Sequence, residues 1–201
     1  KGFDPTGGPA TDSPVKPSSK GAIETYQLWP VITAKSANVS INNDVILVDT
    51  LPAGLKYVVG SAKYNGTPLA ASDVWVQDNS GTFAASTIKF RVPNIMAVAQ
   101  GGPIIPPLEF DAEVMLDDPL NKAGRTLVNT VVIDACAPGA TINASTGTVT
   151  CNVQTAAQTV AERTAVRTIQ LAASGALLVQ KSVIGGDTKE IGASFTMGLR
   201  Y

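Results

Sequence analysis

Four residues of the sequence could together make a covalent cross-link. Asn129 and Lys181 each alternate with apolar residues in a strand-like run, so both side chains are expected on buried faces. A lysine amine can attack an asparagine carboxamide when a buried carboxyl group assists, because burial keeps the amine and the acid neutral. Lys1 or Lys181 would supply the amine, Asn129 the carboxamide and Asp49 the carboxyl group. The pattern is thus compatible with an isopeptide bond.

A simpler interpretation fits the same residues. A buried Asn129 could hydrogen-bond to the backbone, and Lys181 could extend its amine to water. Glu109 and Asp111 are poor candidates for the assisting carboxyl, because the alternation of "LEFDAEVML" directs them towards solvent.

Other chemistry has little support in the composition. The chain has no histidine, the residue used most often in acid–base catalysis near neutral pH. The stretches Asp117–Asn121 and Gln77–Gly81 could bind calcium weakly, but neither has EF-hand spacing and turn chemistry explains both. We therefore expect no catalytic residue, no metal and no cofactor, and we expect that the protein is not an enzyme.

The two cysteines, Cys136 and Cys151, flank the turn-rich stretch "APGATINASTGTVT". Strand-like flanks around such a stretch predict a hairpin closed by a disulfide, which is typical of an oxidising compartment. Two buried free thiols are the alternative.

Net charge and hydropathy narrow the possible partners. A net charge of −1 with 15% charged residues excludes a basic surface for nucleic acid. No apolar run reaches the roughly 20 residues that a membrane span needs. Because the sequence begins at Lys1 without methionine, we expect a processed protein or a piece of a longer one.

The order of strand and turn signals predicts an all-β protein. Residues 1–20 are rich in proline and glycine and form a leading segment, and residues 21–170 hold many short strand patterns separated by turn residues. "PPLEFDAEVMLDD" alternates most clearly, whereas "TAAQTVAERTAVRTIQ" fits a helical turn or strands equally well. The fold class expected is an Ig-like antiparallel β-sandwich.

One corner of the sandwich is visible in "VILVDTLPAGLKYVVGSAKYNG". Asp49 ends the first strand, and its carboxylate is expected to accept backbone N–H bonds at the turn. Pro52 would set the φ of the turn and Gly54 would supply a positive φ. Leu51 and Leu55 would pack beneath, giving a rigid corner.

Three blocks of the sequence resemble one family. They are the corner block, "LEFDAEVMLDDPLNKAGRTLVNTVVIDA", and "LLVQKSVIGGDTKEIGASFTMGLRY", whose "GASFTMGL" echoes "GAIETYQL" near the start. In this order they are similar to the DUF11 repeat domain, found in tandem in large bacterial and archaeal surface proteins. The resemblance implies an Ig-like sandwich, export to the cell surface, and a structural or adhesive role.

Three functions are compatible with this organisation. The first is a structural module of an extracellular assembly (a filament, surface layer or stalk) that self-associates or repeats in tandem. The second is an adhesin that binds a glycan or a host protein, although Trp29 and Trp75 fit core anchors better than a sugar platform. The third is a non-catalytic module of a secreted enzyme. Residues 171–201 would be a linker and the first strands of a following repeat, or a segment that pairs with a neighbouring subunit.

Overall fold

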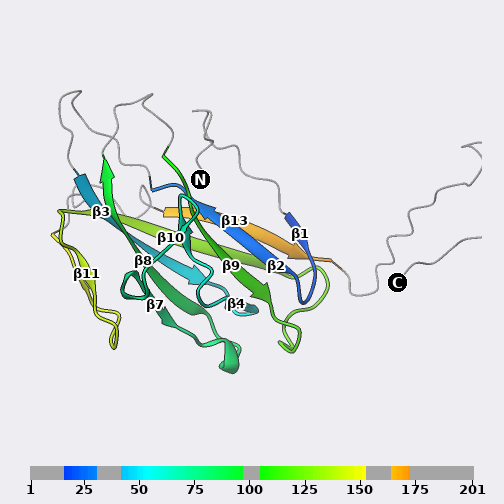
Figure 1. Cartoon of the computed structure of the whole chain (residues 1–201). Coiled ribbons are helices and arrows are strands. Elements are labelled where there is room, and N and C mark those ends of the chain that lie inside the picture. The colour runs from blue at the N-terminus through cyan, green and yellow to red at the C-terminus, as the bar shows by residue number, and fades with distance from the viewer. Residues whose placement is uncertain (1–15, 31–41, 97–104, 153–163, 173–201) are drawn as a thin grey trace, which may run out of the picture.

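The protein is a sandwich of two β-sheets (Figure 1). The computed structural model describes residues 16–30, 42–96, 105–152 and 164–172, and these ranges contain no α-helix. Apart from one edge pair, all strand pairs are antiparallel. The all-β antiparallel sandwich expected from the sequence is confirmed.

The larger sheet has six strands in the order β1–β13–β10–β3–β8–β7. Their bounds are Lys16–Ser18 (β1), Thr164–Leu171 (β13), Thr126–Cys136 (β10), Asn42–Leu51 (β3), Ser86–Met96 (β8) and Val74–Gln77 (β7). Among the strands that the structure describes, only β1 and β13 run parallel to each other.

The smaller sheet has the order β2–β9–β5–β6, and β4 also pairs with β9. Its strands are Ile23–Leu28 (β2), Leu108–Val114 (β9), Lys63–Tyr64 (β5), Thr67–Pro68 (β6) and Leu55–Tyr57 (β4). A separate hairpin joins β11 (Thr141–Ile142) to β12 (Val149–Thr150), and two short 3₁₀ turns cover Ala71–Asp73 and Ser80–Thr82.

Alternation along the strands builds the core between the sheets. In β9, Leu108, Phe110, Ala112 and Val114 are buried, and the intervening residues are half-buried on the outer face. The rings of Phe90 on β8 and Phe110 contact each other in a tilted arrangement with centroids 5.2 Å apart, so the two sheets meet through large side chains.

Strand β3 is buried on both faces over Asn43–Leu47. Its inner side chains join the main core, whereas Ile46 packs outwards against Cys136, Ala140 and Ile142. The β11–β12 hairpin, drawn in yellow in Figure 1, therefore covers part of the outer face of the larger sheet.

Two features of the sequence organisation need correction or completion. The sandwich does not begin at residue 21, because β1 lies within the expected leading segment 1–20 and forms an edge of the larger sheet. A three-residue strand shows no alternation by which it could be recognised. The stretch compatible with either a helical turn or strands, residues 155–170, contains all of strand β13 except its last residue. Residues 173–201, expected to open a second repeat or to pair with a neighbour, lie outside the described residues.

Candidate functional site

The expected cross-link residues Asp49 and Asn129 face each other inside the core. Strands β3 and β10 are neighbours, with Asp49 opposite Val131 in the register. The Nδ2 of Asn129 donates a hydrogen bond of 3.1 Å to Oδ2 of Asp49. Both side chains are buried, with relative exposures of 0% for Asp49 and 3% for Asn129.

This buried pair leaves polar atoms unsatisfied. Asp49 Oδ1, Asn129 Oδ1 and Tyr26 Oη have no hydrogen-bond partner within the described residues. Tyr26 comes from β2 in the opposite sheet and stacks on Phe110. Burial also raises the pKa of Tyr26, and the nearby Asp49 carboxyl adds to that shift. Each unsatisfied buried polar atom destabilises the folded state by roughly 1–3 kcal/mol, so a cluster of three is unusual in a protein core and calls for an explanation.

The Asp49 carboxyl is suited to hold a proton at neutral pH. Burial raises its pKa to about 8, although the hydrogen bond from Asn129 acts in the opposite direction. A neutral carboxyl beside a carboxamide is the arrangement that the isopeptide hypothesis requires. Lys1 and Lys181 lie outside the described residues, so two of the four components come together here and the bond itself stays a prediction.

The corner between β3 and β4 differs in two respects from the sequence expectation. Leu55 N–H donates to Pro52 O, and Gly54 has φ +102°, as a turn with a glycine at its third position requires. Pro52 is the first residue of this turn, so it does not set the φ of the second position. Asp49 does not cap the turn, because its side chain points into the core towards Asn129.

Two residues from the loop before β10 hold the corner instead. Asn121 Nδ2 donates to Gly54 O and to Met115 O, each at 2.9 Å. Arg125 donates to Ala53 O and to Asn121 Oδ1, each at 2.8 Å. Leu51 and Leu55 are fully buried beneath, as expected. Sequence reasoning missed Asn121 and Arg125, because nothing in their spacing reveals a contact with residues about seventy positions earlier.

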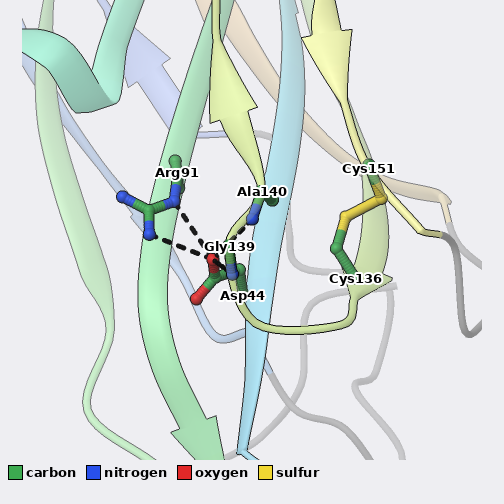
Figure 2. Close-up of a disulfide and its surroundings, with 6 residues drawn as sticks. All are labelled: Asp44, Arg91, Cys136, Gly139, Ala140 and Cys151. Carbon is green, nitrogen blue, oxygen red and sulfur yellow. Dashed lines mark hydrogen bonds and ion pairs between the residues drawn. A yellow bond between two sulfur atoms is a disulfide. The ribbon is translucent and has the colours of Figure 1, made fainter.

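A second polar network fastens the hairpin (Figure 2). Asp44, 2% exposed, accepts hydrogen bonds from the backbone N–H groups of Gly139 and Ala140, both at 2.9 Å. The Arg91 guanidinium also donates to Asp44, at 3.0 Å from Nη2. Burial alone would raise the pKa of Asp44, but the bonds from Arg91 and the backbone outweigh it and hold the pKa below 3.8. This carboxylate therefore ties the first turn of the hairpin to β3 and β8.

A disulfide joins Cys136 to Cys151 at the base of the same hairpin (Figure 2). It connects the end of β10 to the residue that follows β12, with a Cα–Cα distance of 5.4 Å.

The tip of the hairpin is held by an aromatic contact. Lys89 Nζ donates to Gly147 O at 2.7 Å and lies 5.0 Å from the Trp75 ring centroid. Gly147 sits so close to the Trp75 ring that a side chain there would collide with it. Trp75 is thus a packing residue of the hairpin, as the core-anchor interpretation of this tryptophan favoured.

The two acidic stretches weighed as calcium sites form turns. Asp118 Oδ1 accepts from Leu120 N–H, and Asp78 Oδ1 accepts from Ser80 N–H. Within the described ranges no three histidine, cysteine or acidic side chains gather as metal ligands would. The same part of the chain has no helix long and apolar enough to cross a membrane.

Comparisons with known proteins give weak similarities in structure alone. No family model matches the chain, and no curated protein matches its sequence. Among solved structures, it is similar to domains D2 and D3 of the major pilin SpaD from Corynebacterium diphtheriae, with 14% identity, a TM-score of 0.35, and coverage of 71% of this chain and 47% of that chain. BcpA, the major pilin subunit of Bacillus cereus, has 12% identity and a TM-score of 0.37, and the match covers 79% of this chain and 37% of that chain. The T6 backbone pilin of serotype M6 Streptococcus pyogenes has 15% identity and a TM-score of 0.36, and the match covers 81% of this chain and 33% of that chain. The chain spans less than half the length of each of these structures.

Proposed function

We propose that the protein is a non-enzymatic structural module of an extracellular assembly, in which copies of the sandwich associate with one another. The observation that carries this proposal is the covalent closure of the hairpin by Cys136 and Cys151. Disulfides persist in oxidising compartments outside the cytoplasm, which supports export.

The polar side chains with the most partners also serve to fasten the fold. Asp44 ties the hairpin to the larger sheet, and Asn121 with Arg125 ties the loop before β10 to the β3–β4 corner. These contacts join segments far apart in the sequence, so local unfolding of one segment must break bonds to another. Such fastening suits a module that carries load. The resemblance of the corner block to DUF11 repeats of surface proteins supports the same proposal.

The buried Asp49–Asn129 pair fits this function as well. An isopeptide bond to a lysine would add a second covalent tie, releasing one ammonia as the lysine nitrogen replaces the amide nitrogen of Asn129. The cross-link supports the same proposal, because a second covalent tie would stabilise an exported module outside the cell.

The proposal is tested by measuring self-association of the purified chain by sedimentation velocity over a concentration series. Reversible growth in mass without added ligand supports a structural module. A glycan array separates the alternative of an adhesin: saturable binding to one glycan by a chain that stays monomeric would favour that function instead.

A further inference from the structure

Within the described part of the chain, the outer edge of β13 is only partly paired. Strand β1 lies parallel to β13 and covers Ile169–Leu171, opposite Lys16–Ser18. From Ala165 to Thr168, β13 pairs with β10 on one side, and no described residue pairs with it on the other. An open strand edge is a ready template for another strand.

The direction of each amide on this edge follows from two hydrogen bonds. Ala172 N–H donates to Ser18 O on the β1 side, and Leu171 N–H donates to Arg125 O on the β10 side. Because successive amides of a strand point to opposite sides, the amides of Val166 and Thr168 point outwards along the open edge. Those of Ala165 and Arg167 point towards β10.

The face beside this edge is apolar and exposed. Val166 on β13 and Val128 on β10 are each 45% exposed, and their register makes them diagonal neighbours. The hairpin that covers the outer face of β3 does not pack on them. A strand added next to β13 would extend this surface and bury part of Val166.

We propose that the edge of β13 from Ala165 to Thr168 accepts the segment Leu177–Ile184 of a second copy of this chain as an added β-strand. The segment reads "LLVQKSVI" and is bounded by Gly175 and Gly185, so it is long enough to cover the four-residue edge. The inference rests on the proposed self-association and names the surface that mediates it.

Two other segments of the same chain fit this edge less well. Ser18 bonds to Ala172 just beyond β13, so the even-numbered residues of β1 direct their backbone groups towards β13. If β1 continued towards the N-terminus along the open edge, its next bonding position after Lys16 would be Pro14, which has no N–H to donate. A hairpin returning directly from Ala172 would meet β1, which already lies beside the end of β13. A second copy meets neither obstacle, and an arrangement in which each copy donates one strand and accepts another links subunits in series.

The test uses the substitution Val166→Pro, which removes an outward amide and leaves the bonds to β10 in place. Val166→Ala is the matched control, because it shortens the side chain and keeps the amide. We expect Val166→Pro to raise the concentration for half-assembly about ten-fold or more, equivalent to ~1.4 kcal/mol, with an unchanged urea midpoint. Val166→Ala is expected to assemble nearly as the parent does. Equal assembly of the proline variant and the parent would overturn the inference.

Hydrogen exchange gives a second readout that needs no folded proline variant. The amides of Val166 and Thr168 should gain protection on assembly, while those of Ala165 and Arg167 stay protected throughout. Removal of Leu177–Ile184 should abolish that gain. Concentration-independent protection of Val166 and Thr168 would overturn the second copy as the occupant.

The same experiments separate this inference from the proposed function. A chain that stays monomeric at every concentration contradicts the proposed function, and the inference fails with it. A chain that assembles without added protection at Val166 and Thr168 contradicts the inference alone.

Discussion

Asn129 Nδ2 and Asp49 Oδ2 lie 3.1 Å apart in the core, on neighbouring strands of the larger sheet. Removal from water raises the pKa of Asp49 to about 8, so the folded protein keeps a proton that the unfolded chain loses near 3.8. Between those two pH values folding takes up a proton, and stability falls as the pH rises, by up to about 1.4 kcal/mol per pH unit.

Asp49→Asn should flatten this pH dependence, because the amide has nothing to ionise. The free energy of unfolding in urea, measured at pH 5, 7 and 9, checks this expectation. Glu109→Gln is the control, since Glu109 is half-buried on the outer face and bonds Gln27. If parent and Asp49→Asn lose stability equally with rising pH, Asp49 is ionised in the folded state and the burial argument is wrong.

The isopeptide hypothesis predicts a change in intact mass. After reduction, the chain should weigh less than its sequence mass by one ammonia molecule, and Asn129→Ala and Asp49→Ala should each abolish that loss. Tandem mass spectrometry would then show whether Lys1 or Lys181 is joined to Asn129. A parent chain with the full sequence mass would refute the bond.

The Cys136–Cys151 bond predicts that neither thiol reacts with an alkylating reagent in the unfolded, unreduced chain, and that both react after reduction. Closing a loop of this size stabilises the fold by roughly 3 kcal/mol, so reduction should lower the urea midpoint. Labelling of both thiols before reduction would contradict the pairing.

Gly54→Ala should destabilise the corner by about 2–3 kcal/mol, because φ is +102° and the added carbon would collide with Asn121 Oδ1. Gly60→Ala is a matched control, with φ +81° and open space around the added carbon. Urea midpoints compare the two variants. Equal losses would mean that backbone strain acts alone and that the contact with Asn121 contributes nothing.

Asp44→Asn should lower the free energy of unfolding by about 3 kcal/mol, because it weakens bonds to Arg91, Gly139 and Ala140. The folded pKa of Asp44 lies below 3.8, so its stabilisation is present above about pH 4 and is lost as the pH falls through that lower value. Asp78→Asn is the control, since Asp78 is exposed and serves a local turn. Equal losses in the two variants would show that the hairpin does not depend on Asp44.

The sequence predicted the sandwich because alternation along strands such as β9 is a local signal. It identified Asp49 and Asn129 as possible partners but gave Asp49 a capping role, although Asp49 shares its strand parity with the buried Leu47 and Leu51. Asn121 and Arg125 could not be found, because their contacts depend on how distant loops meet. The short strand β1 gave no periodic pattern, and its parallel partner lies about 150 positions later.

Negative-stain electron microscopy of the purified chain across a concentration series shows whether copies of the sandwich associate in series. We expect regular chains of sandwich-sized subunits that form without ligand and shorten on dilution. Isolated single particles at every concentration would contradict that expectation.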